Sequence, residues 1–109
     1  MTVSTHVLDT QIGRPAARMP VRLDRYEEDT WRPLAEGETD DDGRWSAPEA
    51  SGGTGPYRLR FGTGAYYAAL GGATFYPEIG VIFTAADSGA DHHVPLLLSP
   101  FGYSTYRGS

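Results

Sequence analysis

Three histidines are the residues of this chain whose type first suggests chemistry. His6 lies near the start of the sequence, and His92 and His93 lie near its end. Three neutral imidazoles can hold a catalytic zinc ion. Neighbouring residues of a β-strand point to opposite faces, however, so at most one of His92 and His93 can share a site with His6. This spacing argues against a three-histidine metal site. It leaves open a pair that includes His6, as well as exposed or hydrogen-bonded histidines with no function.

An acidic segment in the middle of the chain resembles a calcium-binding loop in its spacing. The residues that match are Glu38, Asp40, Asp42, Gly43 and Glu49. A calcium loop of that type stands between two helices, whereas proline and glycine flank this segment on both sides. We therefore interpret it as an acidic, solvated turn between two strands.

Composition excludes several classes of protein. Nine arginines face fourteen acidic residues, giving a net charge of −5, and the arginines are scattered, so no basic surface for nucleic acid is expected. There is no cysteine and no Gly-x-Ser-x-Gly motif, which excludes thiolate sites and a serine esterase of that type. No apolar run approaches the roughly 20 residues of a membrane span. The first residues lack the features of a secretory signal, which favours the cytoplasm.

The elements that must position these residues are short strands. The chain of 109 residues contains 14 Gly and 8 Pro, spread from end to end, and is expected to form one domain over residues 1–109. One helix is predicted at 64–70, with Thr63 as its N-cap and Gly71 and Gly72 ending it. Short strands with almost no helix favour an antiparallel β-sandwich or barrel. The alternation of apolar residues predicts eight strands, at 2–8, 19–23, 30–34, 44–46, 57–61, 78–84, 91–99 and 101–107.

Four motifs, in order along the chain, resemble the transthyretin-like family and its enzymatic branch, the 5-hydroxyisourate hydrolases. The resemblance spans essentially the whole sequence. The final Tyr-Arg-Gly-Ser is the most discriminating motif, because the hormone-carrying transthyretins lack it. The motifs are the opening at 4–9 with Gly13 and 15–16, then 42–44, 76–79, and the end of the chain from 93–100 to 106–109.

The resemblance implies an all-β sandwich of two four-stranded sheets with one short helix. It also implies a homotetramer with active sites where two dimers meet, and a reaction without metal or cofactor. In that reaction 5-hydroxyisourate is hydrolysed to 2-oxo-4-hydroxy-4-carboxy-5-ureidoimidazoline. The alternative within the same fold is a small-molecule binding protein without catalysis. A structural β-sandwich domain is a second alternative, and it predicts nothing about the histidines.

The resemblance also assigns roles to individual residues. His6 and His93 would act jointly as general base and proton relay, since an imidazole can take a proton from water at neutral pH. Arg44 would orient the substrate and stabilise an oxyanion. Ser109 would contribute its hydroxyl or its terminal carboxylate.

Three further residues of the closing motif, Tyr106, Arg107 and Gly108, would bind the substrate. Two simpler interpretations remain beside these roles. Arg44 could pair with the nearby aspartates, and a Gly-Ser ending could be a cloning scar. His92 stands where many relatives have an aromatic residue, so it could perturb or replace His93.

Overall fold

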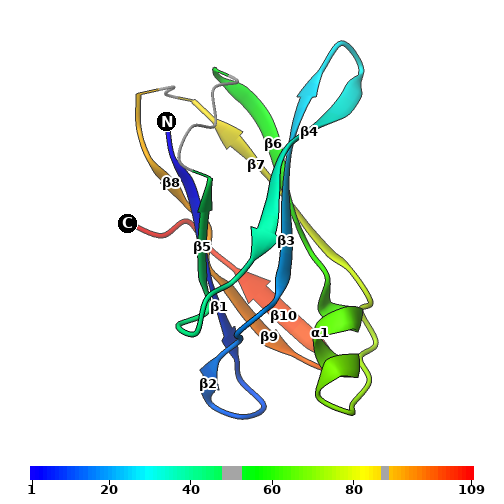
Figure 1. The fold of residues 1–109 in the computed structure, drawn as a ribbon. Helices are drawn as coiled ribbons and strands as arrows, with labels where there is room; N and C mark the ends of the chain where they lie inside the picture. Colours follow the sequence, from blue (N-terminus) through cyan, green and yellow to red (C-terminus); the bar gives the residue numbers. More distant parts are fainter. Residues whose placement is uncertain (48–52, 87–88) are drawn as a thin grey trace.

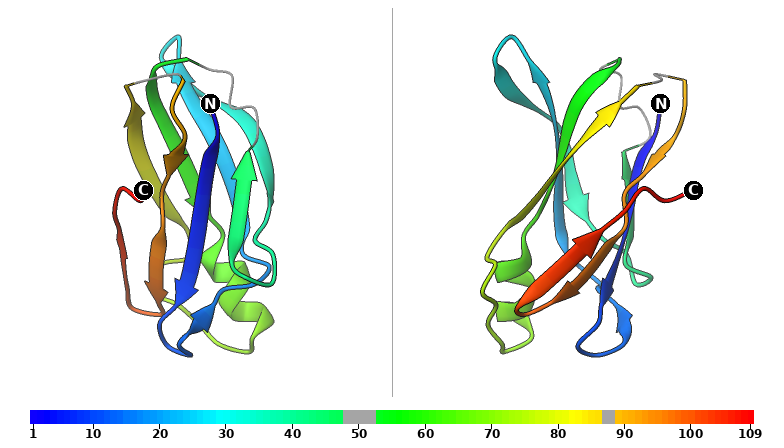
Figure 2. Two further views of the ribbon diagram at one scale, coloured as in Figure 1. Left: turned by 90° about the vertical axis from the view of Figure 1, so that its left-hand side faces the viewer. Right: turned by 180° about the vertical axis from the view of Figure 1, so that it is seen from behind.

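Two β-sheets packed face to face form the protein, with one short helix at one end (Figures 1 and 2). The computed structural model describes residues 1–47, 53–86 and 89–109. The first sheet contains β1 (Val3–Asp9), β2 (Arg14–Pro15), β5 (Arg44–Ala47), β8 (His92–His93), β9 (Leu96–Ser99) and β10 (Gly102–Thr105). The second contains β3 (Pro20–Glu27), β4 (Thr30–Glu38), β6 (Gly55–Phe61) and β7 (Ile79–Ala85).

Strand β1 lies at the centre of the first sheet. It pairs with β5 and β2 in antiparallel fashion and with β8 and β9 in parallel. The order across this sheet is β5 with β2, then β1, then β8 with β9, and finally β10. The second sheet runs β4, β3, β6, β7. The predicted sandwich of two sheets is therefore confirmed. The first sheet has six strands rather than the expected four, because β2 is added and the strand expected at 91–99 is divided into β8 and β9. The pairing of β1 with β8 and β9 makes its first sheet mixed rather than purely antiparallel.

Alternating burial along the strands builds the core. Every second side chain of β1 is buried, and the same is true of β6. Within each strand, the side chains that alternate with the buried ones face outward, as the two-residue period of a strand requires. Eleven of the largest buried apolar side chains fill the space between the sheets: Val3, Val7, Met19, Val21, Leu23, Tyr57, Leu59, Phe61, Ile79, Leu96 and Leu98.

The strand predicted at 91–99 is interrupted in the structure. Residues 92–93 and 96–99 form β8 and β9, with Val94 and Pro95 between them. Proline has no N–H to donate to a neighbouring strand, which explains the break. The two-residue strand β2 was not predicted, because Arg14 and Pro15 carry no alternating pattern.

Helix α1 (Thr63–Ala69) begins one residue earlier than expected. Thr63 is its first residue rather than its N-cap, and no side chain caps the helix. The Thr63 hydroxyl instead donates to the carbonyl oxygen of Tyr76. The helix ends at Ala69, one residue earlier than expected. The two glycines stop it as predicted: Gly71 has a φ of 78°, and Gly71 and Gly72 donate to the carbonyl oxygens of Ala68 and Tyr67. In the described part of the chain no helix is long and apolar enough to cross a membrane.

A buried hydrogen bond attaches this helix to the end of β1. The Tyr66 hydroxyl donates to Asp9 Oδ2 at 2.8 Å, while the amide of Gln11 donates to Asp9 Oδ1 at 3.0 Å. Asp9 is 1% exposed, so its carboxylate depends on these donors. Burial and the neighbouring Asp9 carboxylate raise the pKa of Tyr66, which keeps its proton available as the donor.

Removing the Tyr66 hydroxyl tests this attachment. We expect Tyr66→Phe to lower the free energy of unfolding by about 1–3 kcal/mol, because the buried Asp9 carboxylate loses a partner. Chemical denaturation followed by circular dichroism measures the loss. Tyr26→Phe removes a hydroxyl from a partly exposed ring and should cost far less. Equal losses in the two variants would contradict the proposed role of the bond.

Candidate active site

His6, Arg44 and His93 lie together on the outer face of the first sheet. His6 on β1 is the direct partner of Arg44 on β5. Ser4, two residues before His6 and therefore on the same face, is the partner of His93 on β8. The Ser4 hydroxyl lies 2.9 Å from Nδ1 of His93. Three residues far apart in sequence thus share one surface, as the resemblance implied.

His92 points to the opposite face. Its ring lies 6.2 Å from that of Phe83, its side chain lies between the sheets, and the residue is 9% exposed. Within the described ranges, Nδ1 of His92 has no hydrogen-bond partner. The prediction that only one of the two neighbouring histidines can join His6 is confirmed, and that residue is His93. The described residues contain no group of three or more His, Asp or Glu arranged to hold a metal ion.

The C-terminal segment runs beside His93. The amide of Gly108 donates to the carbonyl oxygen of His93 at 2.9 Å, forming an antiparallel bridge. The Thr105 hydroxyl donates to the carbonyl oxygen of Pro95 at 2.7 Å. These bonds place Tyr106 and Gly108 close to His93, and Ser109 follows as an exposed final residue.

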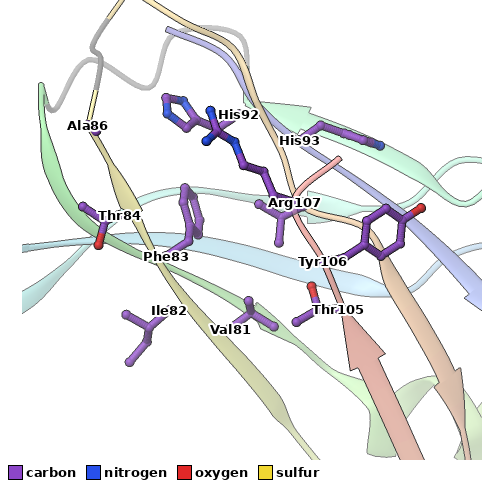
Figure 3. A pocket seen from close by; sticks show the side chains of 11 residues that line it. Val81, Ile82, Phe83, Thr84, Ala86, His92, His93, Thr105, Tyr106 and Arg107 are labelled. Atoms are coloured by element: carbon purple, nitrogen blue, oxygen red, sulfur yellow. The ribbon is translucent and has the colours of Figure 1, made fainter. Parts of the chain in front are cut away.

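Tyr106 and Arg107 point in different directions (Figure 3). Tyr106 lies on the same side of the chain as His93, whereas Arg107 extends toward His92 above Phe83. Arg107 lines a cavity of about 390 Å³ whose walls also include Phe83, His92 and Val94. His93 and Tyr106 line the same cavity. Figure 3 shows their rings on one side of the chain and the Arg107 side chain on the other.

Electrostatics favour the neutral form of His93. Burial lowers the pKa of the His93 imidazole, and the positive charge of Arg44 and the nearby His6 lower it further. A neutral imidazole can accept a proton from water, so the lowered pKa favours the form of His93 that is able to act as a base.

A tight acidic turn places Arg44 at the start of β5. Asp40 Oδ1 accepts bonds from the amides of Asp42 and Arg44, and the Arg44 amide bond in particular lowers the pKa of Asp40. Gly43 has a φ of 74°, and a Cβ there would lie 2.5 Å from the carbonyl oxygen of Val7. The prediction of an acidic turn between two strands is confirmed, since β4 precedes it and β5 follows. Glu49 lies outside the described residues.

Arg44 keeps its side chain out of the ion pairs found in the described part of the chain. The simpler interpretation, in which Arg44 forms an ion pair with a nearby aspartate, is not seen among the described residues, although the charge of Arg44 does help to lower the pKa of Asp40. Sequence reasoning did not single out Ser4, although its position two residues before His6 already placed both side chains on one face of a strand.

Replacing Arg44 tests the electrostatic argument. We expect Arg44→Gln to raise the pKa of His93, because a nearby positive charge no longer opposes protonation of the imidazole. An NMR titration of the His93 ring measures the change. Arg22→Gln removes a charge from the other sheet and should leave the pKa unchanged. An unshifted value in Arg44→Gln would show that Arg44 does not act on His93.

Comparison with known proteins places the chain in a family. The sequence profile of the HIUase/transthyretin family matches residues 3–108. A 5-hydroxyisourate hydrolase of Salmonella dublin is 46% identical over 109 residues, covering 98% of this chain and 80% of that protein.

Solved structures agree with the sequence comparison. The Klebsiella pneumoniae 5-hydroxyisourate hydrolase has a TM-score of 0.87 and 35% identity over the full length of both chains. Sea bream transthyretin, solved with thyroxine, has a TM-score of 0.90 and 30% identity, covering 97% of this chain and 93% of its own. The chain therefore belongs to the HIUase/transthyretin family.

Proposed function

We propose that this protein hydrolyses 5-hydroxyisourate to 2-oxo-4-hydroxy-4-carboxy-5-ureidoimidazoline. The observation that carries the proposal is the meeting of His6, Arg44 and His93 on one face, in a chain 46% identical to a hydrolase with this substrate in its name. Hydrolysis of a cyclic amide is promoted by a general base and by a positive charge that stabilises the oxyanion, and this face offers imidazoles and a guanidinium for these roles.

The steps follow from these three side chains. The imidazoles of His6 and His93 jointly take a proton from water, and the oxygen of that water attacks a ring carbonyl carbon. Arg44 stabilises the negative charge that then develops on the carbonyl oxygen. The ring C–N bond breaks, and the imidazolium returns its proton to the leaving nitrogen. The proton taken from water is returned to the leaving nitrogen, and we propose that these side chains suffice without a metal or cofactor.

The end of the chain supplies the edge of the site. Tyr106 lies on the side of His93 and offers its ring to a planar substrate (Figure 3). Ser109 follows the bridged Gly108, so its hydroxyl would lie near the substrate beside His93. Arg107, whose side chain points away, would contribute to binding only through its backbone or after reorienting.

We further propose that the active protein is a homotetramer with its sites between dimers. His6, Arg44 and His93 stand on the outer face of a sheet, and His93 alone of the three also lines the cavity beside Arg107. A second copy facing this surface would cover the site and shield the substrate and the attacking water from bulk solvent. We assign the protein to the cytoplasm, without nucleic-acid or membrane partners, and fractionation of cells tests that location.

A carrier function is the alternative, because a transthyretin solved with thyroxine has the same fold. A carrier has no need of paired imidazoles beside a guanidinium. The two functions are therefore distinguished by turnover rather than by structure.

Substitution of each histidine tests the catalytic assignment. We expect His6→Ala and His93→Ala to lose about 100-fold or more in rate, the usual contribution of acid–base catalysis. Urate is oxidised with excess urate oxidase, and the decay of 5-hydroxyisourate is followed with a chelator present.

His92→Phe is the control for that assay, since it keeps an aromatic ring against Phe83. Near-normal rates in a folded His93→Ala variant would remove His93 from the mechanism. Decay at the spontaneous rate with the unmodified protein would favour the carrier.

A charged residue placed on the outer face of the first sheet tests the proposed tetramer. Leu97, partly buried on β9, is the partner of Leu8 on the face that carries His6. We expect Leu97→Glu to reduce the tetramer to smaller species and to lower activity, because a carboxylate would be buried without a partner. Sedimentation velocity measures the mass. Leu34→Glu, on the other sheet, should leave the tetramer intact, and an intact Leu97→Glu tetramer would place the interface elsewhere.

A further inference from the structure

The His93 ring is held on two of its edges by residues from opposite ends of the chain. On one edge, Ser4 Oγ lies 2.9 Å from Nδ1. Backbone pairing fixes this approach, since Ser4 and His93 are direct partners and the amide of Val94 donates to the carbonyl oxygen of Ser4 at 2.9 Å. The contact is therefore part of the strand pairing rather than a chance encounter of two mobile side chains.

On the other edge the ring meets Gly108. A Cβ at this position would lie 2.5 Å from Cδ2 and 3.2 Å from Cγ of His93. Gly108 is absent from the glycines with positive φ, so its backbone is open to other residues. Close approach to the imidazole is what requires glycine here. The amide of Gly108, bonded to the carbonyl oxygen of His93, keeps the two in contact.

We propose that Ser4 and Gly108 are positioning residues for His93. Ser4 Oγ accepts a hydrogen bond from Nδ1–H, and Gly108 holds the opposite edge of the ring, so that Nε2 is the atom that exchanges a proton with water. A neutral imidazole carries one N–H, and the hydrogen bond of one nitrogen decides which form of the other is present. With Nδ1–H bonded to Ser4, the lone pair is on Nε2.

This arrangement deepens the proposed hydrolysis and rests on it for its catalytic meaning. Water breaks an O–H bond and its proton moves to Nε2, giving an imidazolium with both nitrogens protonated. Nδ1–H donates to Ser4 before and after that transfer. The same proton then leaves Nε2 for the departing ring nitrogen. Ser4 keeps one bond throughout, so the ring need not turn between the two transfers.

The protonation of the ring can be measured without any substrate. ¹⁵N NMR of the His93 ring above its titration range distinguishes a protonated from an unprotonated nitrogen. We expect protonated Nδ1 and bare Nε2 in the unmodified protein, and loss of that preference in Ser4→Ala. Protonated Nε2 in the unmodified protein would overturn the proposal. The expected tautomer in a protein without hydrolase activity would support the Ser4 bond and overturn the proposed function instead.

Kinetics test the consequence for catalysis. We expect Ser4→Ala to lower kcat about tenfold with KM within twofold, the loss of roughly one hydrogen bond felt in the transition state. Ser4→Thr keeps the hydroxyl and should recover most of the rate. Ser46→Ala removes a hydroxyl from the direct partner of Ser4 on β5 and should have no effect. An unchanged kcat in Ser4→Ala would overturn the positioning role.

Gly108→Ala tests the second edge. We expect a lower kcat and displaced ring resonances of His93, with thermal unfolding showing that the fold is kept. Gly102→Ala is the matched control, because a Cβ there meets no atom closer than 3.8 Å. Unchanged resonances and rate in Gly108→Ala would show that Gly108 does not hold the ring.

Discussion

The pairing of one strand, β1, with both β5 and β8 is the constraint on which the rest of this structure depends. Its inward side chains, among them Val3 and Val7, form part of the core, and its outward side chains, Ser4 and His6, form part of the site. The buried Thr5 hydroxyl donates to the carbonyl oxygen of Val94 at 2.7 Å, which attaches the two ends of the chain to each other. The seven residues of β1 therefore contribute to the core with one face and to the candidate site with the other.

Sequence reasoning reached most of the fold because alternation of apolar residues is a local property. It located the strands around Leu59 and Val21 and the helix that ends at Gly71. It missed the break at Pro95, although the missing N–H of proline was visible, and it took Thr63 for a cap when a distant carbonyl, that of Tyr76, competes for the hydroxyl. Non-local contacts of this kind leave no trace in a local pattern.

The candidate site also has some features that local sequence patterns predict and others that they do not. Strand geometry alone separated His92 from His93. The meeting of His6 with Arg44 and His93 depends on which strands pair, and only the family resemblance indicated that. Alternation along the final segment could have separated Tyr106 from Arg107, yet both were expected in the site. The packing of Gly108 on the His93 ring follows from the bridge between them, which no spacing in the sequence predicts.

The adjacency of His92 and His93 restricts how this part of the chain can change in evolution. Strand β8 is two residues long, and the face of the sheet to which each histidine points determines what surrounds its imidazole. A deletion or insertion of one residue that moved this strand by one register position would exchange the two rings and bury His93 against Phe83. Changes in length just before His92 are therefore tolerated only where the added or lost residue is absorbed before the strand begins. Natural variants should show their insertions there and keep the distance from His93 to Pro95 constant.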